Sequence, residues 1–282
     1  MTTALVLGGG GLAGIAWELG VLLGLQEAGV PVAEADLVVG TLAGSVVGAL
    51  VAGGADLVER YATQTSDAPT SELSVDVDLE QLMTGFASAL GGTQDPQERR
   101  ARGGALSRDA SKVAESERIA VIASRLPSRA WPDRDLRVTA VDTATGERVV
   151  FTRSAGVGLV EAVAASCAVP GVWPPVTIDG RRYMDGGVGS TANADLASNA
   201  DRILVLAPLR GQEHNPLGPT LDEEVAKLRS GGTSALVLDA DEESTAAFGS
   251  NPLDPATRAP SARAGRRQGT DAAAAVRELW QG

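Results

Sequence analysis

The sequence predicts an α/β domain in which helices cover both faces of a parallel sheet. Two apolar segments, "TALVL" at 3–7 and "DLVVG" at 36–40, are expected to form buried strands. Each is followed by a glycine-containing turn and a helical pattern, the first ending near Gly29 and the second running from Ser45 to Ala52. Consecutive strand–turn–helix units are typical of parallel sheets, whose strands are apolar on both faces.

The later part of the chain continues this alternation of strands and helices. Turn residues such as Asp179 and Gly180 join pairs of strand-like segments and predict hairpins. Thr220 is placed to begin a helix and Pro170 to end one. The expected elements are hairpins within 135–151 and 176–187, helices at 158–170, 220–230 and 270–280, and strands at 202–208 and 234–241.

The length of the chain predicts a single domain over 1–282 with two less regular segments. The polar segment 53–130 has weak apolar periodicity and is interpreted as a helical insertion that could cap a binding cleft. The alternative for this segment is a solvated linker. The segment 242–269 contains Pro, Arg and Ser and is expected to be rich in loops.

Charge and composition argue against several classes of function. The net charge of −12 disfavours nucleic acid or an anionic lipid surface as the main partner. The only cysteine, Cys167, and the only histidine, His214, exclude a disulfide within the chain and disfavour a zinc site, so no metal or cofactor is expected. The first residues lack a basic region, and no window of about 20 apolar residues occurs, which predicts a cytoplasmic location.

The first stretch that could carry chemistry is the glycine-rich turn "GGGGLAG" after the first strand. N–H groups at a helix N-terminus stabilise anions, either a phosphate or the oxyanion of acyl transfer. The spacing Gly9-x-Gly11-x-x-Gly14 also matches a dinucleotide fingerprint, and the glycines could serve tight packing alone. The dinucleotide hypothesis is weakened because Glu34 and Asp36 precede the second strand instead of following it.

The second stretch, "VVGTLAGSVVGAL", has the strand–turn–helix pattern of a nucleophile elbow. Gly40 and Gly44 flank the sharp turn, and Leu42 stands at its tip. The third stretch, "MDGGVGS", places Asp185 in a glycine turn. A carboxylate there can act as a general base or can accept hydrogen bonds from the N–H groups of the turn.

These three stretches in this order, with "ASCAVPGVWPPV" before the last, make the chain resemble the patatin-like phospholipase family of lipid acyl hydrolases. The resemblance implies a three-layer α/β/α fold, a lipid or other acyl ester as ligand, and transient contact with a membrane. It implies that Leu42 stands where the family has its nucleophilic serine and that Asp185 is the base of a two-residue dyad without histidine. It further implies that Gly9, Gly10 and Gly11 form the oxyanion hole. Gly14, Gly186 and Gly187 are the remaining glycines of the family motifs.

The chain departs from the family pattern at two positions. Leu42 has no nucleophilic atom, and Ala13 occupies a place where many members have a basic residue. Ser45 could replace the nucleophile, but a serine in the first turn of a helix usually bonds the backbone. Ser190 and Thr191 belong to no elbow.

Three hypotheses about function follow from this sequence. The favoured one is a lipid acyl hydrolase scaffold with a replaced nucleophile and therefore weak or absent hydrolysis. The others are a non-enzymatic binder of lipid or acyl chains, and an enzyme that uses Asp185 without a serine nucleophile.

Overall fold

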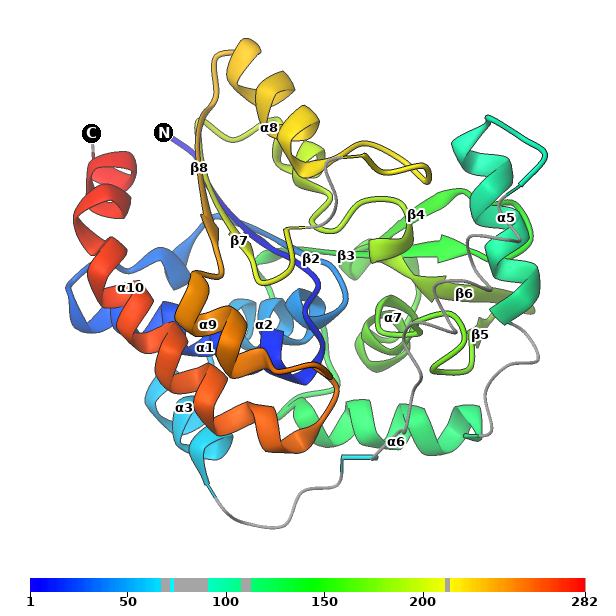
Figure 1. The fold of residues 1–282 in the computed structure, drawn as a ribbon, viewed down its shortest axis with the longest axis horizontal. Helices are drawn as coiled ribbons and strands as arrows, with labels where there is room; N and C mark the ends of the chain where they lie inside the picture. Colours follow the sequence, from blue (N-terminus) through cyan, green and yellow to red (C-terminus); the bar gives the residue numbers. More distant parts are fainter. Residues whose placement is uncertain (67–71, 74–90, 108–112, 211–213, 282) are drawn as a thin grey trace.

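The computed structural model describes residues 1–66, 72–73, 91–107, 113–210 and 214–281 (Figure 1). Its middle layer is an eight-stranded sheet with the order β5-β6-β3-β2-β1-β7-β8, and β4 pairs with β3 beside this path. The strands are β1 (Thr3–Leu7), β2 (Leu37–Gly40), β3 (Asp135–Asp142), β4 (Arg148–Phe151), β5 (Val176–Ile178), β6 (Arg181–Asp185), β7 (Arg202–Ala207) and β8 (Ser234–Asp239).

The sheet is parallel from β3 through β2, β1 and β7 to β8, whereas the β3–β4, β3–β6 and β5–β6 pairs are antiparallel. Both predicted hairpins are therefore confirmed, since β4 follows β3 and β6 follows β5 as antiparallel partners. The mostly parallel sheet of the predicted fold class is confirmed as well.

Helices cover both faces of this sheet (Figure 1). Along β1, Leu5 and Leu7 pack into the core on one face, while Ala4 and Val6 pack into the core on the other. This alternation is the period of a strand buried on both sides. The first face is covered by α1 (Gly11–Glu27), α2 (Ala43–Ala52), α7 (Leu159–Ser166) and α10 (Arg258–Gln281), and the second by α8 (Leu221–Ser230) and the short 3-10 helix η4 (Ala194–Ala197).

The structure tests the predicted start of one helix and the predicted end of another. The helix α8 begins after Thr220, which confirms the predicted cap, and the Thr220 side chain accepts a hydrogen bond from the N–H of Glu223 in a capping box. The helix α7 ends at Ser166, before Pro170 could interrupt it. The prediction of its end was therefore four residues too long.

The helical character expected within 53–130 is present in the part that the structure describes. It comprises α3 (Leu57–Thr65), α5 (Pro96–Ser107) and α6 (Glu115–Arg125). Residues 67–71, 74–90 and 108–112 of this segment lie outside the described residues. Its role as a cap over a cleft remains a prediction.

The expectation of a loop-rich segment at 242–269 was wrong. The structure places α9 (Glu242–Phe248) and the first half of α10 there. The glycines of α10 allow its backbone to touch α1: a Cβ atom on Gly265 would lie 2.3 Å from the carbonyl oxygen of Trp17, and one on Gly269 the same distance from that of Val21. Glycines that suggest a loop in the sequence thus serve close packing between two helices.

No helix among the described residues combines the length and the apolar character that a membrane span requires.

Candidate active site

The three predicted motifs meet at one edge of the sheet because of the strand register. Leu7, the last residue of β1, pairs with Gly40, the last residue of β2. On β3, Val138 pairs with Gly40 and Ala140 pairs with Asp185. Asp185 therefore lies one strand away from β2, opposite a residue of β3 that is two positions beyond the partner of Gly40.

The glycine-rich turn and the elbow are joined directly by backbone hydrogen bonds. The N–H of Thr41 donates to the carbonyl of Leu7 at 3.0 Å, and the N–H of Gly44 donates to the carbonyl of Gly8 at 3.0 Å. A Cβ atom on Gly44 would lie 2.1 Å from the carbonyl oxygen of Leu7, and one on Gly40 would lie 2.5 Å from that of Gly44. Both predicted elbow positions therefore have no room for a side chain.

Leu42 adopts a strained backbone conformation at the tip of this turn. Its φ of 52° and ψ of −111° lie in a region that residues with a Cβ atom rarely adopt, and such strain costs about 1–3 kcal/mol. The surrounding helices hold it in place. Its N–H donates to the hydroxyl of Ser166 at 3.0 Å, and its carbonyl accepts from Ser45 Oγ at 2.6 Å and from Cys167 Sγ at 3.1 Å.

Within the described residues, two N–H groups of the glycine-rich turn have no hydrogen-bond acceptor. The N–H of Gly9 donates to the carbonyl of Thr191 at 2.9 Å, so it is not available to an oxyanion. The N–H groups of Gly10 and Gly11 have no acceptor in the described part of the chain, as expected at the N-terminus of α1. Gly9 still belongs to the site by contact, since its Cβ position is 3.6 Å from the Cβ of Leu42.

The remaining motif glycines allow close packing around the turn. A Cβ atom on Gly10 would lie 2.7 Å from the Cα of Gly14 and the same distance from Pro208 Cβ. A Cβ atom on Gly14 would lie 3.4 Å from the Cβ of Ala43 on α2. These approaches bring the first turns of α1 and α2 together at the sheet edge.

Asp185 is a buried carboxylate with one hydrogen-bond donor among the described residues. Its Oδ1 accepts from the N–H of Gly187 at 2.7 Å. Burial raises the pKa of Asp185 to about 7, although the hydrogen bond from Gly187 acts in the opposite direction. A Cβ atom on Gly186 would lie 2.3 Å from Thr139 Oγ1, so this turn also packs tightly against β3. A carboxyl group that titrates near neutrality is suited to proton transfer.

A buried polar network connects the elbow to the strand beside Asp185. Thr41 Oγ1 accepts from Thr139 Oγ1 at 3.0 Å and from Asn193 Nδ2 at 3.0 Å. It donates to the carbonyl of Ala192 at 3.2 Å. The sequence analysis did not identify Thr139 or Asn193, because no local motif marks a residue whose role depends on tertiary contacts. The network fixes the distance between the elbow and the Asp185 turn.

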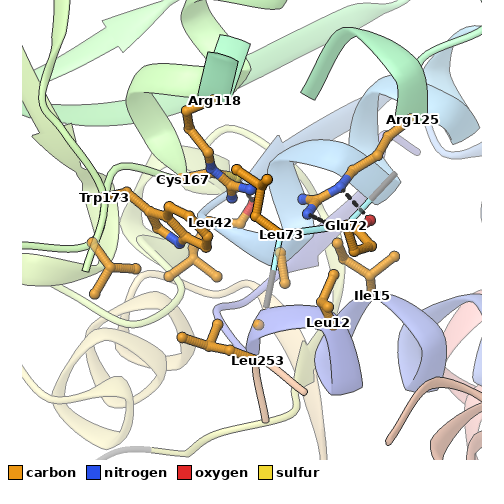
Figure 2. A pocket seen from close by; sticks show the side chains of 13 residues that line it. Leu12, Ile15, Leu42, Glu72, Leu73, Arg118, Arg125, Cys167, Trp173 and Leu253 are labelled. Carbon is orange, nitrogen blue, oxygen red and sulfur yellow. Dashed lines mark hydrogen bonds and ion pairs between the residues drawn. The ribbon is translucent and has the colours of Figure 1, made fainter. Parts of the chain in front are cut away.

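A cavity of about 20 Å³, enough for roughly one water molecule, lies beside Leu42. Figure 2 shows the Leu42 side chain facing this cavity together with two arginines, Arg118 and Arg125, from α6. Sequence analysis missed both arginines. The apolar side chains that line the cavity are Leu12, Ile15, Leu42, Ala43, Leu73, Val169, Trp173 and Leu253.

The other reactive side chains are less well placed to attack a substrate than a side chain at the tip of the elbow would be. Ser45 is fully buried and its hydroxyl is bound to the carbonyl of Leu42, as its position in the helix predicts. Ser190 Oγ accepts from the N–H of Asn193 at 2.9 Å. Cys167 is buried, and burial raises the pKa of its thiol, so it stays protonated at neutral pH. His214 is exposed on a loop.

Within the described ranges, the side chains of His, Cys, Asp and Glu form no cluster of three or more that could hold a metal ion.

Comparisons with known proteins place this geometry in a family. The sequence profile described as "Patatin-like phospholipase" matches residues 5–198. Patatin-like phospholipase domain-containing protein 6 of Homo sapiens is 34% identical over 210 residues, which cover 73% of this chain and 13% of that protein. Lysophospholipase nte1 of Aspergillus oryzae is 50% identical over 60 residues, or 21% of this chain and 4% of the relative. The chain thus matches only a small part of each relative's length.

Two solved structures resemble the whole chain at low sequence identity. VipD from Legionella pneumophila has a TM-score of 0.48 and 14% identity, covering 97% of this chain and 67% of its own. The type III effector protein ExoU has a TM-score of 0.44 and 18% identity, covering 98% of this chain and 53% of its own.

The matched residues 5–198 include the glycine-rich turn, the elbow around Leu42 and the turn of Asp185, and the match covers more than half of the chain. The chain therefore belongs to the patatin-like phospholipase family.

Proposed function

We propose that this protein has the site of a lipid acyl hydrolase in which Leu42 occupies the nucleophile position, so that the chain hydrolyses esters weakly or not at all. The observation that carries the proposal is the backbone of Leu42, with φ 52° and ψ −111°, at the tip of a turn that is hydrogen-bonded to the glycine-rich turn and lies one strand away from the buried carboxylate of Asp185. A strained residue is retained where the fold presents a functional atom.

The same geometry explains how a serine at position 42 would work. The carboxylate of Asp185 would accept the proton of the serine hydroxyl while its oxygen forms a bond to the ester carbonyl carbon. The carbonyl oxygen, now negative, would accept hydrogen bonds from Gly10 and Gly11. Collapse of this intermediate would release the alcohol, which takes the proton from Asp185, and water would then release the acid from the acyl-enzyme.

Leucine at this position removes the bond-forming step and leaves the rest of the site in place. Loss of a serine nucleophile costs about a million-fold in turnover in a well-studied hydrolase, leaving what the oxyanion hole and binding provide. The Leu42 side chain is half-buried and faces the cavity, so it also fills space that an ester carbonyl would need.

The test is an ester-hydrolysis assay of Leu42→Ser beside the unchanged chain, with short-chain p-nitrophenyl esters and a lysophospholipid as substrates. We expect Leu42→Ser to gain activity by at least a thousand-fold and to react with a fluorophosphonate probe at position 42. Leu42→Ala is the matched control, because it makes the same space without a hydroxyl group.

Adding Asp185→Asn to Leu42→Ser should remove most of the gained activity, since an amide cannot accept the proton. A folded Leu42→Ser variant that hydrolyses no ester and does not react with the probe would contradict the proposal.

A further inference from the structure

The strongest feature outside the proposed reaction is the side chain of Arg118 on α6. Its residue is 4% exposed, and its guanidinium group lies over the ring of Trp173, with Cζ 3.9 Å from the ring centre. Its Nε and Nη1 atoms are buried and have no hydrogen-bond partner among the described residues. Burying a cation with unpaired N–H groups is unfavourable, so an anion that satisfies them would stabilise this arrangement.

Among the described residues that line the cavity, positive charge exceeds negative charge, which favours an anion. Arg125 lies on the same helix and holds the carboxylate of Glu72 with two hydrogen bonds, Nε to Oε1 at 3.0 Å and Nη2 to Oε2 at 2.5 Å. Among the described residues that line this cavity, one carboxylate therefore accompanies two guanidinium groups. Burial and the charge of Arg125 lower the pKa of Arg118 to about 10, which leaves it protonated at neutral pH.

Arg118 and the nucleophile position line the same cavity (Figure 2). Cys167 also lines it and donates from Sγ to the carbonyl of Leu42. In the function proposed above, the ester group of a ligand would lie at Gly10 and Gly11, whose N–H groups have no acceptor among the described residues. The arginine is therefore placed to bind a second polar group of the same ligand.

We propose that Arg118 binds the phosphate of an acidic lysophospholipid, and that Glu72 is the internal anion with which this phosphate competes. The orientation of the ester rests on the function proposed above, but binding of the phosphate does not. Guanidinium groups bind phosphate through two parallel N–H donors. The face of Trp173 on which a choline group would stack is already covered by Arg118, which favours an acidic head over a choline head.

The small size of the cavity means that a phosphate can enter only by displacing the Glu72 carboxylate. At about 20 Å³ it has no room for a phosphate while Glu72 and Leu73 line it. An incoming phosphate must displace the Glu72 carboxylate from Arg125, which exchanges one anion for another and keeps the charge balanced. Removing the charge of Glu72 should therefore tighten binding, whereas removing that of Arg118 should weaken it.

The experiment is titration calorimetry of the full chain, with Leu42 in place, against ligands below their micelle concentrations. Oleoyl lysophosphatidic acid is compared with oleoyl lysophosphatidylcholine, with monooleoyl glycerol and with inorganic phosphate. We expect lysophosphatidic acid to bind at least tenfold more tightly than each of the other three. Comparable binding of inorganic phosphate alone would instead show a free-phosphate site and would overturn the assignment to a lipid.

Two variants are expected to change the affinity for lysophosphatidic acid in opposite directions. Arg118→Gln should abolish the preference for lysophosphatidic acid, and Glu72→Gln should increase the affinity about tenfold. Arg153→Gln is the matched control, because Arg153 is exposed and pairs with Asp133. If Arg118→Gln does not fold, Glu72→Gln still decides the question, since unchanged or weaker binding contradicts the competition.

Equal affinity for lysophosphatidic acid and monooleoyl glycerol, or a preference that persists in folded Arg118→Gln, would overturn the proposal. Its failure is separable from that of the hydrolase proposal, because binding is measured without hydrolysis. A phosphate preference together with an inactive Leu42→Ser variant contradicts only the hydrolase proposal.

Discussion

The hydroxyl of Ser45 donates a hydrogen bond of 2.6 Å to the main-chain carbonyl of Leu42. This bond ties the first turn of α2 to the tip of the elbow and occupies the only proton that a Ser45 nucleophile could lose. Ser45 therefore stabilises the turn and does not present its oxygen to a substrate.

Ser45→Ala should lower the free energy of unfolding by about 1 kcal/mol, since one buried hydrogen bond is lost while Cys167 still donates to the same carbonyl. Urea denaturation followed by circular dichroism measures this change. In the Leu42→Ser background, Ser45→Ala should keep most of the esterase activity. Loss of all activity in a folded double variant would identify Ser45 as the nucleophile.

The strained backbone of Leu42 gives an unusual ranking of glycine and alanine. In the middle of a helix or strand, glycine makes a protein less stable than alanine does, by about 0.5–1 kcal/mol. With φ at 52° and ψ at −111°, Leu42→Gly should instead be more stable than Leu42→Ala by about 1 kcal/mol or more, because glycine has no Cβ atom to strain. Thermal and urea unfolding of the two variants give the comparison.

Ala49→Gly within α2 is the reference substitution. It should lower the free energy of unfolding by about 1 kcal/mol, because glycine is less favourable than alanine within a helix. A Leu42→Gly variant less stable than Leu42→Ala would show that the turn relaxes to an ordinary conformation.

The fold was predictable where the sequence has local signals. The apolar segments of β1 and β2 and the flanking Gly40 and Gly44 are sufficient to predict parallel strands and a sharp turn. The first half of α10 was missed because Gly265 and Gly269 usually mark loops, whereas here their missing side chains let α10 contact α1.

The candidate site was only partly predictable for the same reason. The position of Asp185 beside the elbow follows from its motif, but its raised pKa depends on tertiary burial. Arg118 carries no motif, and a basic residue on a polar helix is usually exposed. The N–H of Gly9 is bound to Thr191, a contact between residues distant in the sequence.

Replacing each of the two glycines of α2, Gly44 and Gly48, with alanine should have very different effects on the stability of the protein. A Cβ atom at Gly44 would meet the backbone of Leu7 at 2.1 Å, and the strand cannot move without breaking the sheet. Gly44→Ala should therefore lose more than about 3 kcal/mol or fail to fold, through the clash of a side chain with a rigid backbone.

Gly48→Ala is the matched control for this prediction. The three atoms nearest to its Cβ position all belong to side chains, those of Leu136 and Val38 at 3.2 Å and that of Leu7 at 3.7 Å. The gain of about 1 kcal/mol in helix propensity offsets that crowding, so stability should change little. Equal losses in the two variants, measured by urea unfolding, would contradict the close backbone contact between the elbow and β1.

The raised pKa of Asp185 predicts how the stability of the protein depends on pH. In the unfolded chain this carboxyl titrates near 3.8, and in the folded protein burial raises its pKa to about 7. Between these values the folded state binds more protons than the unfolded state. The contribution of Asp185 to stability is therefore fully present below about pH 4, falls as the pH rises, and is lost above about pH 7.

A shift of roughly three pKa units corresponds to about 4 kcal/mol over this interval. Asp185→Asn should remove that part of the pH dependence and be more stable than the unchanged protein at pH 8, because the amide stays neutral. Urea unfolding between pH 4 and pH 8 measures both curves. The activity gained by Leu42→Ser should rise over the same interval with a midpoint near pH 7, since only the carboxylate accepts the proton of serine. An activity profile that stays flat from pH 5 to pH 8 would show that Asp185 is not the base.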